Sequence, residues 1–143
     1  MACIKDGLEH FKGVGRRFQV LGEFNFEGKN ITLVDDYGHH PREVKAVIDA
    51  VRGSWPGRRL VMIYQPHRYT RTKALFEDFA ATLSEVDVLI MLDIYSAGET
   101  SIPGVDSRTL CGSIRKRGVV DPIFVEGPQL LFNTLQGIIK HGD

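Results

Sequence analysis

The stretch RRLVMIYQPHRYTRTKALFEDFAATLSEVDVLIMLDIY, residues 58–95, decides the fold of this chain. It begins and ends with nearly continuous apolar runs, which are typical of strands buried on both faces of a parallel sheet. Four apolar residues between these runs recur at the spacing of one helix face: Leu75, Phe76, Phe79 and Leu83. The stretch therefore predicts a strand, a helix over residues 70–83 and a second strand parallel to the first.

The same alternation continues on both sides of this unit. Residues 41–53 predict a helix with apolar residues at i, i+3, i+4 and i+7, where Pro41 suits the first helical position and Gly53 the stop. The other predicted elements are a short helix at 4–11, extended segments at 17–30 that lead into a strand at 31–34, a helix at 106–118, a strand at 122–127 and a helix at 128–140.

This order of elements predicts an α/β fold. We expect an open, mainly parallel sheet with helices on both faces, preceded by the short helix and the extended segments. The strand at 31–34 should be the first parallel strand. The residues predicted to fill the core of the sheet are Val61, Ile63, Val88, Ile90 and Leu92.

Composition limits the class of protein. The chain of 143 residues has room for one domain, and its 18 Lys and Arg balance its 18 Asp and Glu. Overall charge therefore recruits neither nucleic acid nor an anionic membrane, and no apolar run approaches the ~20 residues that span a bilayer. The two cysteines, Cys3 and Cys111, lie far apart without metal-ligand spacing, which favours free thiols in a reducing cytoplasm.

Polar residues follow three successive predicted strands. The sequence VDDYGHHP begins at Val34, QPHRYTR spans residues 65–71, and DIYSAGET spans residues 93–100. Because ligands bind at the carboxyl ends of strands in open α/β sheets, we expect these three segments to converge on one crevice.

The first of these segments allows several interpretations. The adjacent His39 and His40 precede Pro41 and could simply cap the helix that follows. A metal site is less favoured, because adjacent side chains of an extended chain diverge. For the same reason at most one of Asp35 and Asp36 faces a ligand, and we expect it to be Asp36.

The second segment holds a candidate anion site. Arg68 and Arg71 lie three residues apart at a predicted helix start, close enough to share a face. A guanidinium presents a planar fork of donors that fits a carboxylate or a phosphate, and the helix dipole also favours an anion. Two solvated surface arginines are the plain alternative, but Pro66 and His67 fix the turn after a buried strand, which favours an anion clamp.

No complete catalytic apparatus is visible. The chain has no phosphate-cradling GxxxxGK[ST] loop and no GxSxG nucleophile elbow. The sequence GVGRRF lacks the third glycine of a dinucleotide fingerprint and follows a predicted helix instead of a strand.

Taken together, GRRFQVLGEF (residues 15–24), VDDYGHHP and QPHRYTR resemble the C-terminal domain of the Mur ligase family, in particular of members that join L-alanine to UDP-N-acetylmuramate. The resemblance covers nearly the whole chain, including FEDFA and IPGVDSRTLC. It implies a cytoplasmic enzyme of peptidoglycan synthesis, with a UDP-sugar domain, a central P-loop ATPase and this Rossmann-like third domain. Such enzymes use ATP and Mg²⁺ to convert the sugar's carboxylate into an acyl phosphate, which the amine of L-alanine attacks.

The resemblance also implies roles for individual residues. Asp36 matches the acid that contacts the ATP ribose, and Arg17 matches the arginine that reaches the nucleotide. His39 and His67 match positions that orient the attacking amine or take its proton. The positions implied to line the alanine pocket are Tyr37, His39, His67, Arg68 and Arg71.

For the domain boundaries, the resemblance implies that residues 1–14 end the preceding central domain and that residues 15–143 form the C-terminal domain without its last strand and helix. The missing upstream domains imply no ligase activity from this chain alone.

A phosphoacceptor receiver remains the alternative, because LVDD and IMLD at two strand ends mimic its acidic cluster, although no lysine follows FVEG (residues 124–127).

Overall fold

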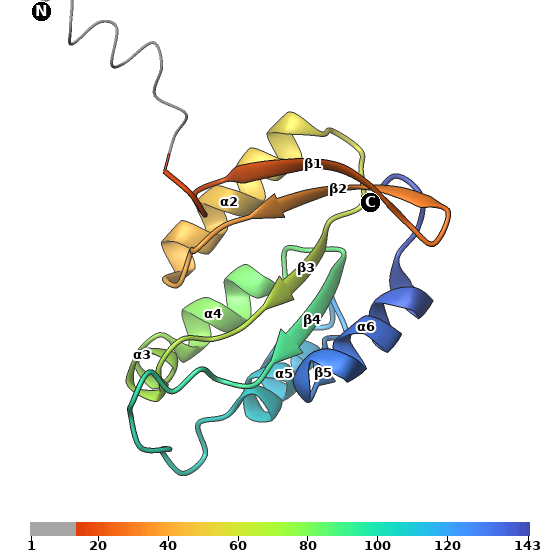
Figure 1. Cartoon of the computed structure of the whole chain (residues 1–143). Helices are drawn as coiled ribbons and strands as arrows, with labels where there is room; N and C mark the ends of the chain where they lie inside the picture. Colours follow the sequence, from red (N-terminus) through yellow and green to blue (C-terminus); the bar gives the residue numbers. More distant parts are fainter. Residues whose placement is uncertain (1–13) are drawn as a thin grey trace, which may run out of the picture.

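The structure is a computed structural model, and it describes residues 14–143. The helix expected at 4–11 lies outside the described residues. Figure 1 shows the order of the elements, which are β1 (Gln19–Phe26), β2 (Lys29–Asp35), α2 (Pro41–Ser54), β3 (Val61–Tyr64), α3 (Tyr69–Ala74), α4 (Phe76–Leu83), β4 (Val88–Leu92), α5 (Ser107–Lys116), β5 (Ile123–Val125) and α6 (Gly127–Ile138).

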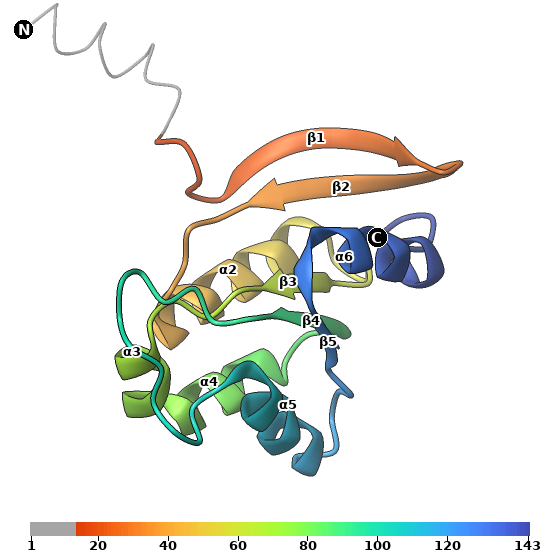
Figure 2. The same ribbon diagram turned by 60° about the horizontal axis from the view of Figure 1, so that its bottom comes forward.

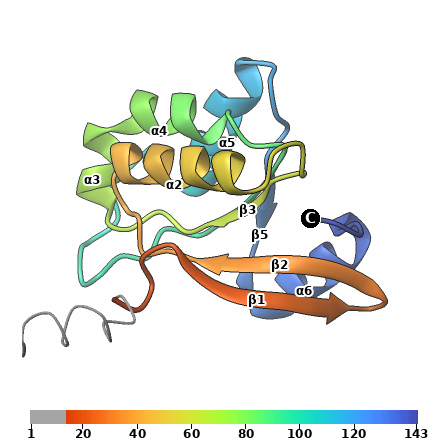
Figure 3. The same ribbon diagram turned by 90° about the horizontal axis from the view of Figure 1, so that it is seen from above.

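The centre of the fold is a parallel sheet in the order β3-β4-β5. Helices α2, α4 and α5 cover one face of this sheet, while α6 lies on the other face together with the β1–β2 hairpin (Figures 2 and 3). The prediction of an α/β fold with a parallel sheet between helices is confirmed. No helix within residues 14–143 is long and apolar enough to cross a membrane.

The prediction that residues 31–34 form the first parallel strand is wrong. Residues 31–34 belong to β2, which pairs antiparallel with β1 in a separate two-stranded sheet. Glu27 and Gly28 both have positive φ, at 50° and 80°, which matches the right-handed twist of a two-residue hairpin turn. The carboxyl end of β2 still points the same way as that of β3, so its loop reaches the same edge of the domain (Figure 1).

The predicted sheet core is also mostly wrong. Of the five residues expected there, Ile90 is fully buried, whereas Ile63 is 43% exposed and the other three are partly buried. The core lies on the opposite face of the sheet, because side chains alternate along a strand and the neighbouring positions face α2, α4 and α5. The strand residues on that face are Met62, Tyr64, Leu89 and Met91.

The helix predicted over residues 70–83 is two helices. Leu75 leaves the helical region, with φ −118° and ψ 25°, and separates α3 from α4. Its side chain still packs against the core, as does that of Phe76. Two short helices therefore place the apolar residues of this stretch against the core, and the break at Leu75 lets α3 take a different direction from α4.

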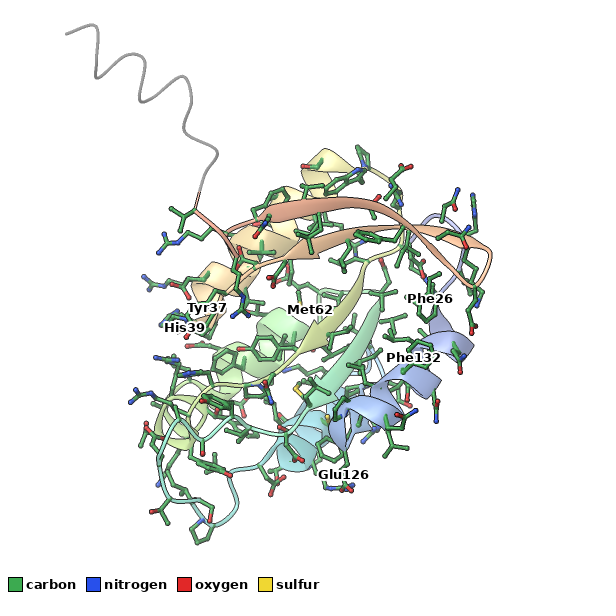
Figure 4. The ribbon with its side chains drawn as sticks, viewed as in Figure 1. Phe26, Tyr37, His39, Met62, Glu126 and Phe132 are labelled. Atoms are coloured by element: carbon green, nitrogen blue, oxygen red, sulfur yellow. The ribbon has the colours of Figure 1, made fainter. Side chains whose placement is uncertain are left out.

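A cavity of about 260 Å³ separates the hairpin from the parallel sheet. Phe26 of β1 contacts Phe132 of α6 edge to face, with ring centroids 5.7 Å apart, and so ties the hairpin to α6 (Figure 4). Most of the side chains around the cavity are apolar, among them Ile31, Leu33, Val47, Val51, Val61, Ile63, Leu135 and Ile139.

Candidate functional site

The loops after β2, β3 and β4 meet in a cluster of aromatic rings, the ring cluster, formed by Tyr37, His39, His67 and Tyr95. The centroid of His39 lies 5.3 Å from that of Tyr37 and 6.0 Å from that of His67. The centroid of His67 lies 5.4 Å from that of Tyr95. Tyr37 and His39 project together from the loop after β2 (Figure 4). The three segments expected to share a crevice are therefore in contact.

Backbone hydrogen bonds join the second loop to the third. Arg68 N–H donates to the carbonyl of Tyr95 at 2.8 Å, and Tyr95 N–H donates to the carbonyl of Pro66 at 2.8 Å. This parallel bridge continues the pairing of β3 with β4 past the ends of both strands. It holds His67 beside Tyr95.

Asp36 organises the first loop. One carboxylate oxygen accepts the N–H of Phe18 at 2.7 Å and the other accepts the N–H of Gly38 at 2.6 Å. A Cβ at position 38 would lie 2.8 Å from the Asp36 carboxylate, so a larger residue there would push this carboxylate out of its present position. Asp35 instead contacts Arg16 at 3.3 Å, and the two aspartates therefore have different partners, as alternation along an extended chain predicts.

The adjacent histidines have different positions. His40 is the N-cap of α2, because its ring nitrogen accepts the N–H of Arg42 at 3.2 Å while Glu43 accepts the N–H groups of both His39 and His40 at 3.0 Å. The N–H donated by His39 holds the pKa of Glu43 below its usual value. The capping interpretation is thus correct for His40, whereas the His39 ring faces the ring cluster, with Nδ1 3.1 Å from the carbonyl of Tyr37.

The two arginines have different surroundings. Arg68 precedes α3 as its N-cap, in the left-handed region with φ 74°, and its guanidinium lies 3.8 Å from Glu99. Arg71 lies within α3, and its Nη1 is 3.3 Å from both Nδ1 and the carbonyl of His67. In the described part of the chain Arg71 has no carboxylate partner. The sequence predicts that the two arginines share one helix face. In the structure Arg68 precedes the helix beside a carboxylate, whereas Arg71 lies within the helix beside a histidine ring.

The pKa of His67 lies below its ordinary value of 6.5, because burial disfavours the charged ring and Arg71, Arg68 and His39 repel it. The ring is therefore neutral at pH 7. When Nδ1 accepts an N–H from Arg71, the neutral ring carries its proton on Nε2.

We expect His67 to titrate below pH 6.5, and Arg71→Ala to raise its pKa because one repelling cation is removed. Since the folded chain resists protonating this ring, its contribution to stability should be lost as the pH falls below about 6.5. The titration is followed by NMR of the histidine ring protons. Arg117→Ala, far along the chain and paired with Glu77, should leave the His67 titration unchanged.

Other site residues differ in how well the sequence identifies them. Arg17, expected to reach a nucleotide, is exposed in the turn before β1. Tyr95 and Glu99 were not predicted individually, although the segment that carries them was. A carboxylate directly after the Ala97-Gly98 turn was the available signal for Glu99.

Comparison with known proteins identifies the family. Residues 16–143 match the family described as Mur ligase, glutamate ligase domain. UDP-N-acetylmuramate–alanine ligase from Thermotoga maritima is 25% identical over 96% of this chain and 27% of its own, with a TM-score of 0.66. The murein peptide ligase from Psychrobacter arcticus, which is 19% identical over the same shares, has a TM-score of 0.70 and shows the fold.

The chain thus spans about a quarter of the length of these two structures. The family match covers β1 to α6 and includes all three loops of the ring cluster. The chain belongs to the Mur ligase family, whose glutamate ligase domain it matches over residues 16–143.

Proposed function

We propose that this chain is the domain that supplies the amino-acid site and part of the ATP site of a cytoplasmic ligase that joins L-alanine to UDP-N-acetylmuramate in peptidoglycan precursor synthesis. The observation that carries this proposal is Arg71, a half-buried guanidinium beside the ring cluster with no carboxylate partner among residues 14–143. Such a group fits the carboxylate of an amino acid. The 25% identity to an alanine ligase supports L-alanine as that amino acid.

The amine of the bound amino acid must be unprotonated to attack a carbonyl carbon. Nδ1 of His39 lies 3.1 Å from the carbonyl of Tyr37, which fixes the proton on Nδ1 in the neutral ring and leaves the lone pair of Nε2 free. His67 has the reverse arrangement, because its Nδ1 faces Arg71. His39 is therefore the better proton acceptor, and His67 orients Arg71. Tyr37 and Arg68 complete the walls of the amino-acid site.

For the nucleotide, Asp36 is the proposed contact of the ribose and Arg17 the proposed contact of the phosphates. Each oxygen of Asp36 accepts one backbone N–H, and a carboxylate oxygen has a second lone pair for a ribose hydroxyl. Bound ATP supplies the phosphate that activates the sugar's carboxylate. Within the described residues no group of three or more His, Cys, Asp or Glu could hold a metal ion, and Mg²⁺ would bind together with the phosphates of ATP in the complete ligase.

The test is phosphate release by the complete ligase that contains this domain. With ATP, Mg²⁺ and UDP-N-acetylmuramate, release should require L-alanine, and this chain alone should release none. Release with a murein peptide in place of L-alanine would identify the second candidate, a murein peptide ligase, whose fold this chain shares. The receiver alternative has no support, because the Mur ligase match covers residues 16–143.

We also propose that the complete domain, residues 15–143 with a further strand, holds this strand in the cavity between β2 and β3. Each of these strands pairs on one edge only in the described structure. Gly142 N–H already donates to the backbone carbonyl of Asn30 at 2.8 Å, and Thr32 N–H donates to the backbone carbonyl of Asp143 at 3.0 Å. Residues 142 and 143 therefore run beside the free edge of β2.

A segment Val-Thr-Val-Leu-Val added after Asp143 should fill this cavity and slow hydrogen exchange of the β3 amides by about tenfold, which corresponds to ~1.4 kcal/mol. Exchange is measured by mass spectrometry on both chains. A Gly-Ser segment of equal length should have no effect. Equal exchange with the two segments would contradict the proposed strand.

A further inference from the structure

We propose that Glu99 is a positioning residue of the amino-acid site, which caps α3 from the neighbouring loop and holds Arg68 aside, so that Arg71 alone is presented to the substrate's carboxylate. This inference rests on the proposed function. Its evidence lies in three features of the loops after β3 and β4.

The first feature is the start of α3. The N-cap residue, Arg68, makes no side-chain cap, so the first N–H groups of the helix need other partners. Glu99 supplies one, because its Oε2 accepts the N–H of Thr70 at 3.0 Å and its Oε1 accepts the hydroxyl of Thr70 at 2.6 Å. These two hydrogen bonds hold the pKa of Glu99 below its usual value. The cap of α3 is therefore supplied by the loop after β4.

The second feature is the environment of Arg68. Its N–H donates to the carbonyl of Tyr95, and its carbonyl accepts both the N–H and the hydroxyl of Thr72, at 3.1 and 2.8 Å. Its guanidinium is 3.8 Å from Glu99, whose side chain is only 18% exposed. Arg68 is thus held by its backbone, and Glu99 is the carboxylate that lies near its guanidinium.

The third feature is the turn that carries Glu99. Ala97 and Gly98 both have positive φ, at 50° and 85°, and Glu99 N–H donates to the carbonyl of Ser96 at 3.0 Å. This tight turn directs Glu99 back toward α3, and the loop after β4 passes beside α3 in Figures 1 and 2. The alanine at a positive φ is strained, which is consistent with a loop shaped for a specific contact.

Loss of Glu99 should have two consequences. The first turn of α3 loses its cap, and the position of Arg71 within this helix becomes less defined. Arg68 loses its carboxylate partner, so its side chain is no longer held aside. Because the carboxylate contact proposed for Arg71 depends on a defined position of α3, loss of the cap should weaken binding of an amino-acid carboxylate, while the nucleotide contacts proposed for Asp36 lie on a different loop and should not change.

The test compares Glu99→Ala and Glu99→Gln with Glu77→Ala as a matched control. Glu77 also forms an ion pair with an arginine, Arg117, at 3.0 Å, but it lies on α4. In the complete ligase, Glu99→Ala should raise the KM for L-alanine about tenfold and leave the KM for ATP unchanged. Glu99→Gln keeps an acceptor for Thr70 and should raise the KM less. An unchanged KM for L-alanine, an equal change for ATP, or the same change in Glu77→Ala would overturn the proposal.

A second measurement separates this proposal from the proposed function. In the present chain, Glu99→Ala should speed hydrogen exchange at the amide of Thr70, Glu99→Gln should do so less, and Glu77→Ala should have no effect. Unchanged exchange at Thr70 in Glu99→Ala would show that Glu99 does not cap α3. If the unmodified ligase does not use L-alanine but Thr70 responds as expected, the proposed substrate is wrong and the capping role remains.

Discussion

Replacing Arg71 by alanine should weaken the use of L-alanine by the complete ligase roughly ten- to a hundredfold. Hydrogen bonds to charged groups contribute about 1.5–3 kcal/mol, and each ~1.4 kcal/mol corresponds to a factor of ten. We expect this loss at Arg71 because no carboxylate among residues 14–143 binds its guanidinium, which is therefore available to the carboxylate of the substrate. Its contacts at 3.3 Å with the ring and carbonyl of His67 fix its direction without neutralising its charge.

Lysine should not rescue the loss at Arg71, because an ammonium cannot reproduce the planar fork that binds a carboxylate at two points. Arg68→Ala should cost less than Arg71→Ala, since Arg68 is already paired with Glu99. The KM for ATP should stay unchanged, and Arg117→Ala serves as the control for removal of a cation. Steady-state kinetics with each substrate varied in turn decide the matter. An unchanged KM for L-alanine in Arg71→Ala would show that Arg71 does not bind the substrate.

The sequence predicts most of the elements of this fold because their signals are local. Apolar runs and helical spacing are read within 15 residues, and β3, β4 and α2 all lie where these patterns place them. Two other features depend on distant partners. The apolar run at 31–34 is compatible with either kind of sheet, and only its contact with β1 makes it antiparallel.

The core face of the parallel sheet was unpredictable for a related reason. Strands such as VLIML in β4 are apolar at every position, so the sequence does not say which alternate set meets the larger helical layer. Leu89 and Met91 meet that layer, while Ile63 on the other face of β3 stays 43% exposed. A strand with alternating apolar and polar residues would have shown which of its faces meets the core.

The candidate site shows the same division between local and distant information. Convergence of the three polar segments follows from the parallel strands, and the structure brings these segments together. The separate roles of His39 and His40 could not be assigned, because either ring is chemically able to cap α2. Likewise, nothing near Arg68 in sequence shows that Glu99, which lies 31 residues away, would be the carboxylate beside it.

Replacing Asp36 by alanine should raise the KM for ATP by about tenfold or more, and should raise the KM for L-alanine less. The substitution removes the proposed contact with the ribose and leaves the N–H groups of Phe18 and Gly38 without their charged acceptor. A lost charged hydrogen bond costs about 1.5–3 kcal/mol, so the free energy of unfolding should also fall by a comparable amount. Asparagine retains one acceptor oxygen and should give a smaller effect on both quantities.

The neighbouring Asp35 provides the control for this experiment. Its contact with Arg16 is a solvent-exposed ion pair, with side chains 38% and 61% exposed, and such pairs contribute only about 0–1 kcal/mol. Asp35→Ala should therefore change neither KM nor the urea midpoint measurably. If Asp36→Ala lowers the urea midpoint but leaves the KM for ATP unchanged, Asp36 is only a structural bridge between the two backbone segments. A larger rise in the KM for L-alanine than for ATP would instead place Asp36 in the amino-acid site, beside His39.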